Sequence, residues 1–175
     1  MFIKPILFAV LSAGIVFLSR KSLFGLRTHG FFRFFAFECL LGLILLNADY
    51  WFRRPFSPPQ LLSWLLLAGS LVLAAHGFYL LKVTGKPRKG IEDTTVLVRR
   101  GAYRYIRHPL YTSLLLLGWG AFLKDVSFFS AAFVLLATGF LYATARIEEA
   151  ENREKFGASY AQYMKSTRMF IPFLL

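Results

Sequence analysis

Apolar stretches of membrane-spanning length constrain this chain more than any other feature of its sequence. The clearest covers residues 60–82, where Lys82 is the only Lys, Arg, Asp or Glu. About 20 apolar residues in a helix cross the ~30 Å hydrocarbon core of a bilayer, so this stretch is long enough. Because further stretches share its composition, we predict an all-α integral membrane protein with about five transmembrane helices in a single domain, residues 1–175. The other predicted spans are residues 3–19, 31–47, 110–123 and 126–145.

The basic charge of the chain also fits a membrane protein. The net charge is +12, which in a soluble protein would suggest a nucleic-acid partner. Here the cations gather between the apolar stretches, so we interpret them as topology signals and expect no nucleic acid as partner. With five spans, all but four of the 21 lysines and arginines fall on one side of the membrane. Positive loops stay in the cytoplasm, which predicts a cytoplasmic C-terminus. The four exceptions are Lys4, Arg53, Arg54 and Lys124.

Two polar stretches, residues 94–111 and 146–172, are predicted to share that cytoplasmic side. The first ends in G-A-Y-R-Y-I-R-H-P-L-Y, and Pro109 is suited to the first turn of a helix. His108 would then lie just ahead of the free N–H groups and partial positive charge of a helix start, which favour a carboxylate. The second stretch carries four of the nine acids, between Glu148 and Glu154. The helix start and the acids together predict a site for a zwitterion, a ligand with both a carboxylate and an ammonium group. The tyrosines of the first stretch add a surface for a flat ring.

Other common sites are not indicated. The chain has no G-x-G-x-x-G after a strand, no P-loop and no H-E-x-x-H. Its three histidines, His29, His76 and His108, are too scattered to predict a metal site. The single Cys39 excludes an internal disulfide and a cysteine-based metal cluster.

The two polar stretches resemble the isoprenylcysteine carboxyl methyltransferase family, which is related to the phospholipid N-methyltransferases. The resemblance covers about residues 94–172. It rests on the R-H-P-L-Y of the first stretch, on E-E separated by six residues from F-G-x-x-Y-x-x-Y, and on a final R-x-x-I-P.

This resemblance implies S-adenosylmethionine as cofactor, bound at the cytoplasmic face without a Rossmann domain. It implies that His108 and Pro109 meet the methionine carboxylate, and that Glu148 pairs with the α-amino group. The segment from Thr95 to Val98 is expected to be extended and to hold the adenine. The cofactor contacts carried over in this way are Thr95, Val96, Leu97, Val98, Tyr103, His108, Pro109, Leu110, Tyr111 and Glu148.

The resemblance further implies a lipophilic or prenylated methyl acceptor, and carboxyl O-methyl transfer as the reaction. Arg146 is the nearest cation to the place where relatives with a prenylcysteine substrate have an arginine. Glu38 and His76 lie within predicted spans, about 8–9 Å below the same surface at 1.5 Å per residue. Ionisable groups inside a membrane are usually paired or functional. We expect these two to pair and to line the acceptor pocket, or else to form a structural hydrogen bond.

Three alternatives remain beside this interpretation. The chain could be a phospholipid amine N-methyltransferase, or a nicotinamide-dependent enzyme similar to the sterol reductases. It could also be a non-catalytic membrane protein that gathers anionic lipids, a reading that explains the positive charge but not the acidic stretch. Membrane lipids are the expected partners in every case.

Overall fold

The computed structural model describes residues 3–23, 28–88 and 93–172. Within that part the chain is helical, with two isolated backbone bridges and no strand, which confirms the predicted fold class. The helices are α1 (Ile3–Leu23), α2 (His29–Leu46), α3 (Pro58–Val83), α4 (Pro109–Phe122), α5 (Phe128–Phe156) and α6 (Ala158–Ser166), with 3-10 turns η1 (Ala48–Tyr50) and η2 (Gly101–Arg104).

Four of these helices, α1, α2, α3 and α5, are long and apolar enough to cross a membrane. The fifth predicted span corresponds to α4, whose 14 residues extend about 21 Å at helical rise. Four predicted spans match the observed helices to within a few residues. The exception is α5, because the prediction ended it at residue 145 and the helix continues to Phe156.

The described chain packs into two compact units. The first contains residues 1–67 and 115–147, and the second contains residues 68–114 and 148–175. Helices α3, α4 and α5 each supply residues to both units. The single membrane domain stays a prediction.

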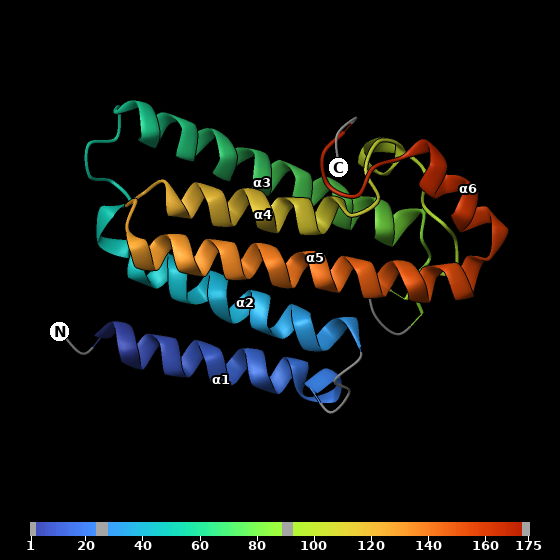
Figure 1. Cartoon of the computed structure of the whole chain (residues 1–175), viewed down its shortest axis with the longest axis horizontal. Helices are drawn as coiled ribbons and strands as arrows, with labels where there is room; N and C mark the ends of the chain where they lie inside the picture. The colour runs from blue at the N-terminus through green and yellow to red at the C-terminus, as the bar shows by residue number, and fades with distance from the viewer. Residues whose placement is uncertain (1–2, 24–27, 89–92, 173–175) are drawn as a thin grey trace. The chain divides into compact units, whose positions relative to one another are not determined.

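The first unit is built around apolar contacts between helices. Helix α1 lies alongside α2 (Figure 1). Leu43 of α2, Ala121 of α4 and Val134 of α5 form a buried core. Closer to the start of α2, the ring of Phe35 stacks on that of Phe140, with centroids 5.4 Å apart.

Polar groups at the ends of α2 and α4 form hydrogen bonds with one another inside this unit. Asn47 is 0% exposed, and its Nδ2 donates to the carbonyl of Ala121 at 2.9 Å and to that of Asp125 at 3.3 Å. Its Oδ1 accepts from the hydroxyl of Ser130 at 2.9 Å. The last carbonyls of a helix lack partners within the helix. The side-chain amide of Asn47 therefore supplies hydrogen-bond donors to a carbonyl near the end of α4 and to one in the turn after it.

The second unit brings both predicted polar stretches together. After α3, the N–H groups of Thr95 and Val96 donate to the carbonyl of Gly85, which folds residues 85–88 against 93–96. Further along, Ile106 and Arg168 form a parallel bridge. The C-terminal segment after α6 therefore runs beside the residues that precede α4.

Candidate functional site

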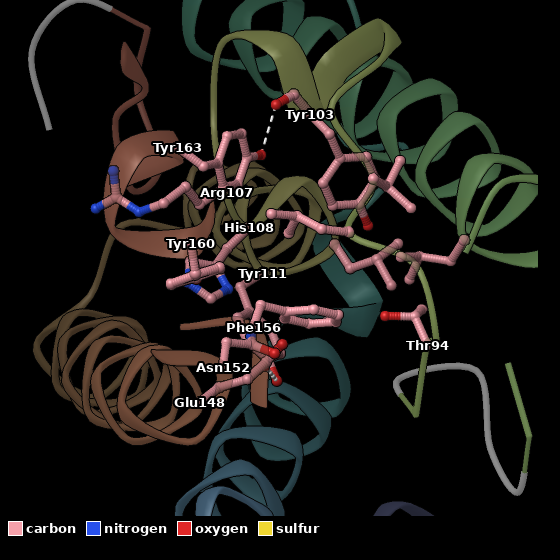
Figure 2. A pocket seen from close by; sticks show the side chains of 14 residues that line it. Thr94, Tyr103, Arg107, His108, Tyr111, Glu148, Asn152, Phe156, Tyr160 and Tyr163 are labelled. Carbon is pink, nitrogen blue, oxygen red and sulfur yellow. Dashed lines mark hydrogen bonds between the residues drawn. The ribbon is translucent and has the colours of Figure 1, made fainter. Parts of the chain in front are cut away.

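A pocket in the second unit collects side chains from both polar stretches (Figure 2). It contains about 600 Å³ of space, part of which is open to solvent. Seven of the ten predicted cofactor contacts line it: Leu97, Val98, Tyr103, His108, Leu110, Tyr111 and Glu148. The other lining residues are Leu81, Thr94, Arg107, Asn152, Phe156, Tyr160 and Tyr163.

His108 stands at the start of α4, as the sequence indicated. Its carbonyl accepts the N–H of Thr112 at 2.9 Å, which marks it as the residue ahead of the helix. The side chain is buried, and its ring stacks on that of Tyr111 with centroids 5.4 Å apart and planes at 19°. Its Nε2 faces Oε1 of Glu149 at 3.5 Å, an ion-pair contact that does not have the geometry of a hydrogen bond. Buried polar atoms normally have hydrogen-bond partners, so this imidazole keeps capacity for a ligand group.

Glu148 is held in place by a tyrosine from α4. The hydroxyl of Tyr111 donates to Oε2 of Glu148 at 2.5 Å. Tyr111 is buried whereas Glu148 is half-buried, so the carboxylate keeps access to the pocket. A carboxylate in such a position can form a charge-assisted hydrogen bond with an ammonium group.

Aromatic side chains form a large part of the wall (Figure 2). The hydroxyl of Tyr163 donates to the carbonyl of Tyr103 at 2.5 Å, which fastens α6 to η2. The rings of Tyr160 and Tyr163 meet edge to face, with centroids 5.8 Å apart. Burial raises the pKa of both phenols above its ordinary value, so both keep their protons at neutral pH. These neutral rings, with Phe156, offer flat apolar faces to a ligand.

The segment from Thr95 to Val98, predicted to be extended, bends at Thr95 and Val96 and is only partly turned toward the pocket. Thr94, Leu97 and Val98 line it, whereas Thr95 and Val96 are exposed. The backbone N–H groups of Thr95 and Val96 are bonded to the carbonyl of Gly85. Pro109, also among the predicted contacts, is buried but does not line the pocket. A cofactor role stays a prediction for all ten residues, and these three do not line the pocket.

The residues predicted for an acceptor pocket are not brought together within one unit. Glu38 of α2 belongs to the first unit, where its Oε1 is buried without a hydrogen-bond partner in the described part of the chain. His76 of α3 belongs to the second unit, is exposed, and accepts the N–H of Ala102 at 3.4 Å. Arg146 of α5 is exposed and belongs to the first unit. The pairing of Glu38 with His76 stays a prediction.

Five residues that line the pocket were not among the predicted cofactor contacts: Arg107, Asn152, Phe156, Tyr160 and Tyr163. The two tyrosines carried a signal, because residues three apart share one face of a helix. No comparable signal identified Asn152 of α5. Among the described residues, no group of three or more His, Cys, Asp or Glu could hold a metal ion.

Comparison with known families agrees with the resemblance. A family model described as phospholipid methyltransferase matches residues 59–159, more than half of the chain. The matched region contains α3, α4, α5 and most of the pocket lining.

Two bacterial proteins named methanethiol S-methyltransferase are also similar to this chain. The protein from Pseudomonas deceptionensis is 27% identical over 145 residues, which cover 78% of this chain and 48% of the relative. The one from Pseudomonas sp. strain GM41 is 26% identical over 113 residues, covering 63% of this chain and 43% of the relative. The chain therefore spans less than half the length of these relatives. No solved structure matches the chain significantly.

Proposed function

Because this chain belongs to the phospholipid methyltransferase family, we propose that it is an integral membrane enzyme that transfers a methyl group from S-adenosylmethionine to a lipophilic acceptor. The observation that carries the proposal is the pocket of the second unit. It combines a buried histidine at the start of α4, a carboxylate held by Tyr111, and a wall of neutral aromatic rings.

These residues fit the three parts of S-adenosylmethionine. His108, together with the positive end of α4, suits the carboxylate of the methionine moiety. Glu148 suits its α-amino group. The rings of Tyr103, Phe156 and Tyr160 suit the adenine, which needs a flat apolar surface.

When bound, S-adenosylmethionine supplies a methyl group that is already activated by its sulfonium. What the protein must add is proximity and alignment, because an in-line displacement depends on both. Tyr111 fixes the orientation of Glu148, and the link from Tyr163 to Tyr103 holds α6 against η2 at the edge of the pocket. These contacts position a ligand and shield it from water, and no general base is needed for an acceptor that is already anionic.

For the acceptor, the motifs favour the carboxylate of a prenylcysteine-like molecule, and Arg146 is its proposed contact. Membrane lipids are the proposed surroundings of this molecule. The bacterial relatives favour a second candidate, because both are named for S-methylation of a thiol. A thiolate accepts a methyl group without a general base, but a free thiol must first lose its proton to water or to a base. An aminophospholipid would have to lose its proton first, and desolvation near the bilayer would help by lowering the amine pKa.

The cofactor is tested by calorimetry on the protein in lipid nanodiscs. We expect saturable binding of S-adenosylmethionine and S-adenosylhomocysteine, and none of NADPH. His108→Ala and Glu148→Gln should each weaken binding at least about tenfold, as loss of a charge-assisted hydrogen bond implies. Glu154→Gln, an exposed acid on the same helix, is the matched control. Binding of NADPH alone would favour a reductase, and undiminished affinity in both variants would refute the assigned contacts.

The acceptor is tested by transfer of a labelled methyl group to a panel in the same nanodiscs. The panel contains a farnesylated cysteine derivative, an aminophospholipid and a long-chain alkanethiol. Methylation of the first alone supports carboxyl transfer, and methylation of the thiol alone supports the chemistry named for the relatives. If none is methylated while S-adenosylmethionine binds, an acceptor of these three classes is excluded.

We also propose that the pocket opens to the cytoplasm, because the second unit holds most of the cations that the positive-inside rule assigns to that side. Ser159, exposed on α6, can report this as Ser159→Cys in a Cys39→Ala background. An impermeant maleimide should label it in inverted vesicles and not in intact cells. Labelling in intact cells would instead show that α6 and the pocket face the outside of the cell.

A further inference from the structure

Glu149 follows Glu148 directly but has different surroundings. Successive residues of an α-helix point about 100° apart, and only Glu148 lines the pocket. Glu149 is 3% exposed. Its Oε1 accepts a hydrogen bond from Nε of Arg107 at 2.6 Å. The two acids of the E-E motif therefore have separate tasks.

Arg107 is fixed on both of its sides. Its Nη1 donates to the carbonyl of Thr167 at 2.6 Å, and its backbone N–H donates to the carbonyl of Arg168 at 2.7 Å. Figure 2 shows its guanidinium directed away from Glu148. The ion pair with Glu149 is buried, since both side chains are at least nine-tenths covered. A buried carboxylate is stable only when such a partner balances its charge.

Glu149 also faces His108. The same Oε1 that meets Arg107 lies 3.5 Å from Nε2 of the imidazole. The other contacts of this ring are with flat aromatic surfaces, Tyr111 at 5.4 Å and Phe170 at 6.1 Å between centroids. Stacking fixes the plane of the ring, whereas the contact with Glu149 fixes which edge of the ring faces α5.

We propose that Glu149 and Arg107 are positioning residues that set the imidazole of His108 for the carboxylate of the bound cofactor. Arg107 balances the charge of Glu149, so the pair orients the ring without placing a bare negative charge beside an anionic ligand group. Neither side chain is expected to touch the reacting methyl group. The inference rests on the proposed function and adds how the pocket distinguishes ligands that carry the amino-acid carboxylate.

The test compares two ligands that share the adenosine thioether but differ in the amino-acid part. S-Adenosylhomocysteine carries the carboxylate, and 5′-methylthioadenosine lacks it. We expect Glu149→Gln to weaken binding of the first about tenfold or more, the scale seen when the partner of a ligand-binding histidine is lost. Binding of 5′-methylthioadenosine should stay unchanged. Glu154→Gln is the matched control, because it makes the same change on an exposed turn of α5.

A double-mutant cycle with His108→Ala separates positioning from packing. In the His108→Ala background, Glu149→Gln should cause no further loss of S-adenosylhomocysteine affinity, since the residue it acts through is gone. Arg107→Lys keeps the charge but not the planar guanidinium fork, so it should show an intermediate loss for the same ligand only.

Three results would overturn the inference. Equal losses for both ligands in Glu149→Gln would mean that the pair merely supports the fold, and unchanged affinities would mean that it does not act on His108. Additive losses in the cycle would show that Glu149 acts independently. If the unaltered protein bound neither ligand, the proposed function itself would fail, and that result is distinct from the other three.

Discussion

Replacing Gly85 by alanine should open one wall of the pocket. Gly85 is buried directly after α3, and a Cβ there would lie 2.5 Å from the carbonyl oxygen of Leu81 and 2.6 Å from Cγ2 of Thr94. Both distances are shorter than real Cβ contacts. The carbonyl of Leu81 is part of the backbone of α3 and moves little. Thr94, which lines the pocket, therefore has to move instead.

The size of the effect follows from these contacts. Forcing one carbon into a packed site costs about 1–3 kcal/mol. The carbonyl of Gly85 also accepts the N–H groups of Thr95 and Val96 at 2.9 and 3.2 Å, and each hydrogen bond contributes about 1 kcal/mol net. A displaced segment thus loses about 3 kcal/mol or more, which corresponds to a roughly 100-fold change in an opening equilibrium.

Hydrogen–deuterium exchange of residues 93–98 in nanodiscs measures this opening. We expect roughly 100-fold faster exchange in Gly85→Ala, and partial recovery when Thr94→Ser removes the nearer methyl group. Gly139→Ala is the control, because a Cβ on that glycine of α5 has nothing within 4 Å. Exchange in Gly85→Ala that matched the unaltered protein would refute the close packing of Gly85 against Thr94.

Three further changes test other parts of the fold. Asn47→Ala leaves the carbonyls of Ala121 and Asp125 without their donor, and should lower the free energy of unfolding by about 3 kcal/mol, measured by detergent titration. Tyr163→Phe removes the bond to the carbonyl of Tyr103 and should cost about 1–3 kcal/mol, visible as faster exchange in α6. Because burial raises the pKa of Tyr160 and Tyr163, their contribution to stability is complete below about pH 10 and declines at higher pH. Replacing both by phenylalanine should therefore make the free energy of unfolding less dependent on pH above about pH 10. An unchanged pH dependence would contradict the burial of the two phenols.

The predicted membrane helices were accessible from sequence because hydropathy reports directly which segments lipid tolerates. The same measure misplaced the end of α5. Residues 146–156 are too polar for the bilayer, but the alanine, glutamate, arginine and lysine among them are good helix formers. Hydropathy therefore ended a span where the helix itself continues, to Phe156. That continuation places Glu148 and Glu149 on a regular helix and determines the angle between them.

The orientation of individual side chains depended on packing that no local pattern contains. An extended segment turns successive side chains to opposite faces, so the four consecutive residues from Thr95 to Val98 could not all face one pocket. In the structure Leu97 and Val98 do so, together with Thr94, where the chain bends toward η2. Arg107 meets Thr167 across a sequence separation of 60 residues, and only the folded second unit brings those two together.

The two motifs that carried the family resemblance thus contain residues of two kinds. In R-H-P the histidine lines the pocket, while the side chain of the arginine is bonded to Glu149 and Thr167. In E-E the first glutamate lines the pocket and the second is committed to Arg107. Each motif supplies one member of a ligand-facing pair and one member of a supporting pair, so neither pair is complete until α5 meets the residues ahead of α4. A change in either supporting residue should therefore weaken binding of the same ligands as a change in His108, the residue through which both act.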